Sequence, residues 1–358
     1  MKKLVLALSV LAVPVGLVAC GGDNPPPAPP PPPSVTAEPP PPPPAPEPPP
    51  PAPKPSMSEM QKTTLLGMQA AFNAHDPAKV ASFHSQDVVS STPGPDGSWK
   101  DTNGRDALQQ REAEFFSKVD PQMALVRVYQ KGDVAVGEWI GGGSEKENPS
   151  KKVGFRAASV WWFDGDGLIK KAHMYIDEGT IAMQLGKMPG KARDVVAIPT
   201  GDAQWIPGAA DDNKAVDLLK ANWPTTFPKK DKKAWEASVT DDYLHEEIAM
   251  PLDWKAKKGA LDEFDMLTKA VPDMSVSFEN AWGFGDVAIG EFTFKGTQKG
   301  ALGPIKPTNK PFALHGLEID VFKDGKLQKA TSYTNGIELA GQLGLLPKPK
   351  ATPPASKK

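Results

Sequence analysis

The chain has 358 residues, a formal net charge of −2, 41 prolines and one cysteine. A nearly balanced charge lacks the basic footprint of nucleic-acid-binding proteins, so we expect no nucleic acid partner. A single cysteine excludes an internal disulfide. The length beyond the proline-rich region is sufficient for two domains of ordinary size.

The first twenty residues have the features of an export signal. Lys2 and Lys3 precede an apolar stretch, residues 4–18, which is too short and too interrupted to remain as a membrane-spanning helix. The stretch runs into LVAC, ending at Cys20, and resembles the lipobox of bacterial lipoproteins. The resemblance implies that residues 1–20 are a signal peptide with a lipobox and that Cys20 is lipidated. The alternative is an ordinary secretory signal in which the cysteine falls by chance.

A lipidated Cys20 would anchor the protein to a membrane of the cell envelope. Gly21 follows the cysteine, where enteric bacteria use Asp to retain lipoproteins in the inner membrane, so the outer membrane is favoured over the inner membrane.

Residues 21–57 are dominated by proline. Such a segment offers few backbone donors and has almost nothing to bury, which predicts a disordered linker of polyproline II type. The alternative is a ligand for a proline-binding module. Residues 348–358 are mainly Pro, Ala and Lys and predict a disordered tail.

Two sequence marks occur twice, in the same order and at nearly the same spacing. GDVAVGEW at 132–139 returns as GDVAIGEF at 285–292, and QLGKMP at 184–189 returns as QLGLLP at 342–347. This pattern indicates a tandem duplication of one domain. We place the first domain at residues 58–200 and the second at residues 208–347.

In the first copy, helical patterns precede strand patterns. A helix is predicted to begin at a Ser58 cap, a second at Asp76-Pro77 and a third at Gly104. Strands are predicted over 123–129, 134–140, 155–163 and 168–176, with a hairpin turn at 164–167 and a closing helix at 178–186. The three glycines at 141–143 are interpreted as a loop.

The second copy has the same order of patterns. Helices are predicted near 213–226, 232–239 and 258–270, strands near 275–282, 287–294, 312–322 and 327–334, and a closing helix at 336–343. Three helices followed by long hairpin-connected strands predict an α+β fold. In this fold a curved antiparallel sheet wraps the three helices, giving a cone with an apolar interior.

Six marks then follow one another along the second copy: VPDM at 271–274, GDVA at 285–288, GTQKG at 296–300, PTNKP at 307–311, DGKL at 324–327 and QLGLLP. With them the copy resembles the SnoaL-like branch, ester cyclases and polyketide cyclases, of the nuclear-transport-factor-2-like superfamily. The resemblance implies two tandem cone-shaped α+β barrels that work without metal or cofactor. It also implies an acid/base carboxylate inside the cone, where burial raises its pKa towards neutrality.

The resemblance places the carboxylate at the end of the last strand, where Asp177 stands in the first copy. His173, Tyr175 and Asp177 are two residues apart, so they can face one cavity as a catalytic set. The alternative for Asp177 is an N-cap of the closing helix, because Asn335 stands at the same position of the second copy. The alternative for His173 is an ordinary hydrogen-bonded strand histidine.

In the second copy, Asn335 and Tyr333 are expected to orient a ligand, since an amide cannot shuttle a proton. His245 follows the second helix, where the resemblance implies a pocket-facing histidine, and Ser90 occupies that place in the first copy. His315 could meet His245 across the cone. Both histidines are interpreted as ligand-binding hydrogen-bonders, with a structural role as the alternative, and their spacing does not match a metal site.

Two functions are consistent with these patterns. The first is an envelope-anchored lipoprotein whose cones bind a small apolar molecule. The second is a cofactor-free polyketide or ester cyclase, isomerase or hydrolase with Asp177 as general acid/base. We favour binding slightly, and we expect the two domains to pair within the chain.

Overall fold

The computed structural model describes residues 28–30 and 55–346. The predicted signal peptide, Cys20, most of the proline-rich linker and the tail lie outside the described residues. From Pro55 onward the described residues belong to one compact unit. None of the helices in the described ranges is long and apolar enough to cross a membrane.

Three helices precede or interrupt the first sheet: α1 (Met57–Asn73), α2 (Pro77–Ser82) and α3 (Arg105–Lys118). Asp76 and Gly104 stand at the predicted starts of the second and third helices. The predicted cap at Ser58 is wrong. Ser56 caps α1 through a capping box with Glu59, whereas Ser58 lies within the first turn and donates to the Gln130 side chain.

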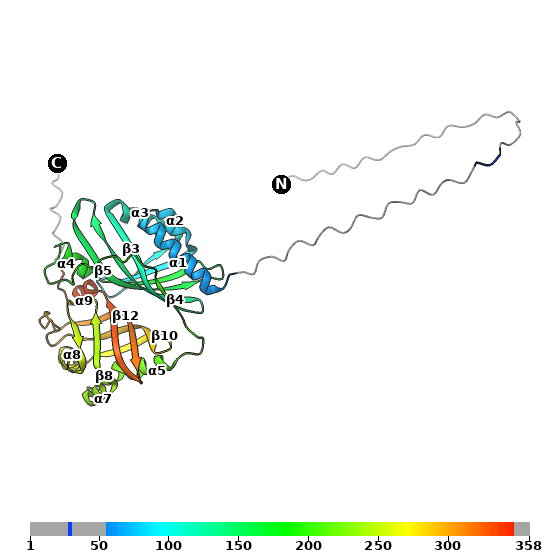
Figure 1. Cartoon of the computed structure of the whole chain (residues 1–358). Helices are drawn as coiled ribbons and strands as arrows, with labels where there is room; N and C mark the ends of the chain where they lie inside the picture. Colours follow the sequence, from blue (N-terminus) through cyan, green and yellow to red (C-terminus); the bar gives the residue numbers. More distant parts are fainter. Residues whose placement is uncertain (1–27, 31–54, 347–358) are drawn as a thin grey trace, which may run out of the picture. The chain divides into compact units, whose positions relative to one another are not determined.

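The first domain is built on a seven-stranded sheet of order β2-β1-β6-β5-β4-β3-β7. Its strands are β1 (His84–Pro93), β2 (Trp99–Asn103), β3 (Val119–Lys131), β4 (Val134–Glu145), β5 (Asn148–Phe163), β6 (Ile169–Ile176) and β7 (Gln204–Pro207). A closing helix, α4 (Glu178–Gln184), follows β6. The first three helices lie together against the sheet (Figure 1).

The second domain repeats this plan on a six-stranded sheet of order β10-β11-β12-β13-β8-β9. Its strands are β8 (Val239–Glu247), β9 (Asp253–Lys255), β10 (Ser275–Phe284), β11 (Val287–Thr297), β12 (Pro311–Lys323) and β13 (Lys326–Thr334). Its helices are α5 (Lys214–Ala221), α6 (Trp223–Thr226), α7 (Lys232–Ser238), α8 (Ala256–Ala270) and α9 (Gly336–Gln342). The α+β prediction is confirmed for both domains.

Each sheet contains a short hairpin that the sequence patterns did not predict. β1 and β2 lie between α2 and α3, and β8 and β9 lie between α7 and α8. β1 pairs in parallel with β6, and β8 pairs in parallel with β13, so neither sheet is purely antiparallel.

The interpretation of residues 141–143 as a loop is wrong. All three glycines lie in β4, paired with β3 and β5. Close backbone approach explains the residue type: a Cβ on Gly143 would lie 2.2 Å from the Asp120 carbonyl oxygen, and Gly143 has a φ of 140°.

The repeated Gln-Leu-Gly mark ties each closing helix to a strand. The Gln184 side chain bonds both the N–H and the carbonyl of Gly154 in β5, at 3.1 and 3.0 Å. Gln342 makes the same pair of bonds to Ala313 in β12, both at 2.8 Å. The mark therefore encodes a packing contact.

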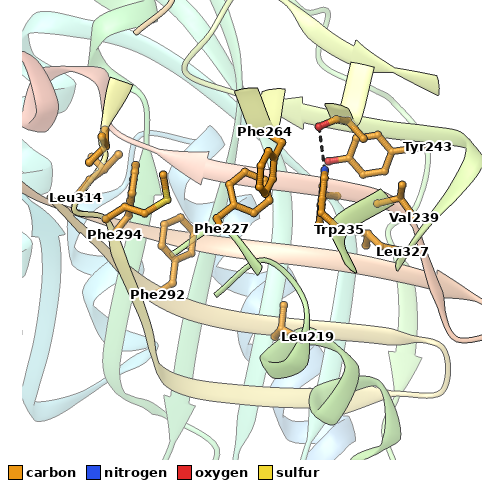
Figure 2. Packing of buried hydrophobic residues seen from close by; sticks show 14 of the residues in the cluster. Leu219, Phe227, Trp235, Val239, Tyr243, Phe264, Phe292, Phe294, Leu314 and Leu327 are labelled. Atoms are coloured by element: carbon orange, nitrogen blue, oxygen red, sulfur yellow. Dashed lines mark hydrogen bonds between the residues drawn. The ribbon is translucent and has the colours of Figure 1, made fainter. Parts of the chain in front are cut away.

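Three apolar clusters hold the fold. One fills the interior of the first domain and one the interior of the second, where Phe227, Trp235 and Phe264 stack edge to face (Figure 2). The third joins the outer faces of the two sheets, with Val160 and Tyr175 from the first domain against Leu317 and Tyr333 from the second.

Hydrogen bonds accompany the third cluster. The Tyr175 hydroxyl donates to Glu291 at 2.8 Å, and the Tyr333 hydroxyl donates to Glu138 at 2.7 Å. Both carboxylates are buried.

Candidate active site

The interior of the second domain contains a cavity of about 180 Å³. Most of its wall is apolar and aromatic: Trp223, Phe227, Trp235, Met250, Trp254, Met266, Leu267, Phe292, Phe294, Leu302, Ile305, Leu314, Leu327, Ala330 and Leu339. Trp235 is fixed in this wall because its indole N–H donates to the Ala260 carbonyl at 2.9 Å (Figure 2). A mainly apolar cavity with a few polar groups is the usual form of a small-molecule site.

A hydrogen-bonded network of polar side chains lies at one end of the cavity. His245 on β8 contacts Glu263 on α8 through Nδ1 at 2.7 Å and Ser332 on β13 through Nε2 at 2.8 Å. The Ser332 hydroxyl donates in turn to Glu318 on β12. Tyr243 donates to the second oxygen of Glu263 at 3.1 Å. Four elements thus bring these groups together.

The charge state of His245 follows from its partner. Burial alone would lower the pKa of His245, but the adjacent Glu263 carboxylate outweighs burial and raises the pKa to about 10. The imidazole is therefore protonated at neutral pH, and both ring nitrogens donate, one to Glu263 and one to Ser332.

Glu247 lies on β8, two residues beyond His245, and also lines the cavity. One of its carboxylate oxygens accepts from Thr334 at 2.8 Å and from the Ala249 N–H at 3.1 Å. Desolvation in the cavity raises the pKa of Glu247 to about 7, against the opposing effect of the protonated His245. This carboxyl group can therefore give or take a proton at neutral pH.

Two further acids lie on β12: Glu318 lines the cavity, and Asp320 is two residues farther along the strand. Burial raises the pKa of Glu318, and burial together with the neighbouring Glu318 raises the pKa of Asp320 well above its ordinary value. Asp320 is fully buried, and neither carboxyl oxygen has a hydrogen-bond partner among the described residues. Both effects favour the neutral, protonated form of Asp320.

The strand registers identify the corresponding positions of the first domain. Gly137 pairs with Ser159 where Gly290 pairs with Glu318, and Ala135 pairs with Trp161 where Ala288 pairs with Asp320. Ser90 corresponds to His245, and Met174 to Ser332. Glu112, the eighth residue of α3, stands where Glu263 is the eighth residue of α8, but the counterparts of His245, Glu318 and Asp320 are not ionisable, and the indole of Trp161 packs in the core of the first domain.

The structure places the predicted catalytic set away from this cavity. His173 Nδ1 and the Tyr175 hydroxyl both contact Glu291 of the second domain, at 2.6 and 2.8 Å. Asp177 caps α4 by accepting from the N–H groups of Gly179 and Thr180, and it also accepts from Gly336 at 2.8 Å. The contacts of all three side chains are structural ones, and their catalytic roles stay predictions.

Of the four predicted ligand-binding residues, His245 and Asn335 line the cavity. Asn335 also caps α9 by accepting from the Ile337 N–H at 3.0 Å. Tyr333 and His315 lie on the other face of the sheet, where Tyr333 contacts Glu138 and His315 contacts Glu338. The structure does not bring His315 and His245 together. Within the described residues, no group of three His, Cys, Asp or Glu side chains is arranged as a metal site.

Sequence reasoning did not single out Glu247, Glu263 or Asp320. Glu247 could have been found from its spacing, because it follows His245 by two residues and a strand places such residues on one face. That signal requires β8 to be recognised as a strand. Asp320 lies in a long strand of β-forming residues, where an isolated acid is unusual.

Substitution of Asp177 separates its capping role from a catalytic one. Asp177→Ala leaves three buried N–H groups without an acceptor and should lower the free energy of unfolding by about 1–3 kcal/mol. Asp177→Asn should cost clearly less, because Asn335 caps α9 in the same way. Urea unfolding of both variants measures the difference, and equal losses would argue against the capping explanation.

Two family models match the chain. A model described as SnoaL-like domain matches residues 66–172, and a model described as SnoaL-like polyketide cyclase matches residues 218–343. The chain is a tandem SnoaL-like protein. Only the second of these two models names an activity in its description, that of a polyketide cyclase, and no curated protein matches the chain.

Several solved structures are similar to parts of this tandem SnoaL-like chain. A putative SnoaL-like polyketide cyclase from Jannaschia sp. CCS1 has 14% identity and a TM-score of 0.35, and the match covers 39% of this chain and 97% of that chain. TsrD from Streptomyces laurentii has 21% identity and a TM-score of 0.34, with 38% and 98% covered. IdmH, a putative polyketide cyclase from Streptomyces antibioticus, has 17% identity and a TM-score of 0.32, with 36% and 98% covered.

Proposed function

We propose that the second SnoaL-like domain binds a small, largely apolar carbonyl compound and moves a proton on it without a cofactor. The observation that carries the proposal is Glu247, a carboxyl group with a pKa of about 7 in the wall of an apolar cavity. Binding and catalysis share this site, so the proposal places the chemistry at Glu247 rather than at Asp177.

The size and character of the cavity support an apolar ligand. An engineered apolar cavity of about 150 Å³ accepts benzene, and the volume here is about 180 Å³. A ligand of one or two rings therefore fits this space. The polar groups gather on β8, β12 and β13, so they can meet one functional group of the ligand while the aromatic wall contacts the rest.

The acid/base arrangement supports proton transfer. A general base works best when its pKa lies near the working pH, which is the situation of Glu247. The protonated His245 and the neutral Asp320 keep the end of the cavity from accumulating negative charge. A carbonyl compound that loses an α-proton to Glu247 would develop its negative charge near these groups.

A binding experiment tests the first half of the proposal. We expect 2-acetylnaphthalene, an apolar bicyclic ketone, to bind the purified protein with one site per chain in isothermal titration calorimetry. Leu339→Trp on α9 should abolish binding because the larger side chain fills the cavity that Leu339 lines. Leu66→Trp makes the same change on an exposed position of α1 and should leave binding unchanged. Equal affinities of the two variants would place the ligand elsewhere.

We also propose that the protein is an envelope lipoprotein attached through Cys20, with the outer membrane as its location. The LVAC sequence and the following proline-rich segment support this proposal. Lipid anchoring that depends on several acyl chains is stable, so Cys20→Ser should move the protein from the membrane fraction to the soluble fraction and abolish incorporation of labelled palmitate. Labelling that persists in the variant would exclude Cys20 as the attachment site.

A further inference from the structure

The wall of the cavity that carries Glu247 is a single short segment of the second domain. Glu247, Ala249, Met250 and Trp254 all line the cavity. The segment makes few backbone bonds of its own: Ile248 donates to the Ser332 carbonyl at 2.9 Å, and Met250 donates to the Glu247 carbonyl at 3.0 Å. Glu247 itself pairs with Ser332 of β13, so contacts from outside the second domain bear on residues 248–253 beyond it and, through them, on the Glu247 carboxyl group.

Arg193 holds this segment at both ends. Its Nη2 atom lies 2.9 Å from the Glu247 carbonyl oxygen, 2.9 Å from the Leu252 carbonyl oxygen and 2.8 Å from Asp253 Oδ1. One guanidinium thus bridges the start and the end of the loop between β8 and β9. A planar, always charged donor that bonds several acceptors limits how far they can separate.

Arg193 lies in the first domain, between α4 and β7, and the first sheet fixes it. Its carbonyl oxygen accepts from the Gln184 side chain at 3.0 Å, and that same side chain bonds Gly154 in β5. The Val196 N–H also donates to the Gly154 carbonyl, at 3.2 Å. The guanidinium is therefore presented from a backbone that is attached to the first sheet.

The first domain contacts the same segment in two other ways. Arg156 on β5 donates to Glu246 at 2.7 Å, immediately before Glu247. Ile248, immediately after it, is buried in the cluster that joins the two sheets, together with Ala158 and Val160. Glu247 is thus flanked on both sides by residues that the first domain holds.

We propose that Arg193 is a positioning residue for Glu247. The first domain, which lacks ionisable counterparts of His245, Glu318 and Asp320, serves the site of the second domain by holding Arg193 in place. This inference rests on the proposed function. Arg193 touches no ligand in this proposal, because its contacts are to the backbone and to Asp253. It limits the motion of the wall that carries the acid/base group.

The test compares Arg193→Met, Arg193→Lys and Arg105→Met in the full chain. Arg105 is the matched control because it likewise donates to a backbone carbonyl, that of His84 at 2.8 Å, but within the first domain. We measure the exchange of the methyl protons of 2-acetylnaphthalene in D₂O at saturating ketone, and amide hydrogen exchange of residues 248–252. Misplacement of a catalytic group by ~1 Å can cost up to about 100-fold in rate.

We expect Arg193→Met to lower the saturated rate by about 10–100-fold, with a smaller change in ketone affinity, and to speed amide exchange at residues 248–252. Arg193→Lys should restore part of the saturated rate and part of the amide protection, because an ammonium group donates to the same carbonyl oxygens. Arg105→Met should change neither. An unchanged rate in Arg193→Met, or an equal loss in Arg105→Met, overturns the inference.

A wild-type protein that neither binds nor exchanges the ketone would instead contradict the proposed function. The amide-exchange comparison needs no ligand, so it still reports whether Arg193 holds the segment. Unchanged amide protection in Arg193→Met overturns the inference whatever the ketone does.

Discussion

Glu247→Gln is expected to slow the deuterium exchange of the methyl protons of 2-acetylnaphthalene by about 100–10,000-fold near neutral pH, the usual contribution of a general acid/base. In the proposed step the Glu247 carboxylate removes a proton from the methyl carbon, and the electron pair of the C–H bond moves into the enolate. The Glu247 carboxyl group exchanges this proton for a deuteron of the D₂O solvent, and the deuteron is then transferred to the carbon of the enolate. Glutamine has nearly the same shape as glutamate and keeps the hydrogen bond from Thr334, but its amide group cannot take a proton from the ketone.

Proton nuclear magnetic resonance of the ketone in D₂O measures this rate directly. Affinity for the ketone should change little, because the aromatic wall is untouched. Glu236→Gln, at an exposed position on α7, is the matched control and should exchange the ketone at the wild-type rate. If Glu247→Gln retained wild-type exchange, Glu247 would not be the acid/base group.

The same substitution has a consequence for pH dependence. The pKa of Glu247 in the folded protein is about 7 and its ordinary value is 4.5, so the folded state retains the proton to higher pH. The stability that this group contributes is therefore present below pH 4.5 and is lost as the pH rises through about 7. Urea unfolding should show a smaller decline in stability over this window in Glu247→Gln. The wild-type exchange rate should rise with pH, reach half of its maximum near pH 7 and level off above that pH.

Glu291→Ala is expected to destabilise the protein by about 3–5 kcal/mol, the usual effect of removing one member of a buried polar pair. Glu291 is 2% exposed and accepts from Tyr175 at 2.8 Å and Asn280 at 2.7 Å, with His173 at 2.6 Å. Its removal leaves the buried Tyr175 hydroxyl and the half-buried Asn280 and His173 side chains without this partner. Guanidinium unfolding measures the loss.

Glu279→Ala is the control on the same sheet, because Glu279 is exposed and accepts one short hydrogen bond, from Thr293 at 2.6 Å, so its loss should change stability by about 1 kcal/mol. The Glu291 experiment also tests our proposal that the two domains pair within the chain, since His173 and Tyr175 belong to the first domain and Glu291 to the second. A loss in Glu291→Ala no larger than in Glu279→Ala would contradict that pairing.

The long strands and their order could be predicted from the sequence because their side chains alternate and their hairpin turns carry Asp-Gly. Asp324 and Gly325 indeed both have positive φ, as a tight two-residue turn requires. The hairpins β1–β2 and β8–β9 could not be predicted in this way. β8 reads VTDDYLHEE. Its polar residues His245 and Glu247 line the cavity and Glu246 contacts Arg156 of the first domain, so a hydrophobic pattern gives no signal.

The candidate site was predicted in part for the same reason. His245 and Asn335 were found because the family resemblance marks their positions, but Glu247 lay in a strand that had not been recognised. The position after the last strand, which the family resemblance singled out, carries a helix cap and a contact between the domains in both copies. Asp177 and Asn335 both cap a helix there, and both reach into the other domain, Asp177 to Gly336 and Asn335 to the Pro93 carbonyl at 3.3 Å.

The two tyrosine–glutamate bonds between the sheets have a consequence for the origin of the molecule. Tyr175 and Glu138 belong to one copy and Tyr333 and Glu291 to the other, and each tyrosine bonds the glutamate of the opposite copy. A surface that offers both members of such a pair is complementary to itself, so a single ancestral copy could form a twofold-symmetric homodimer. In a homodimer every substitution appears in both subunits, so the two copies cannot diverge. Fusion into one chain removes that constraint, so the two copies can differ, as they do where Glu318 and Asp320 of one copy stand opposite Ser159 and Trp161 of the other.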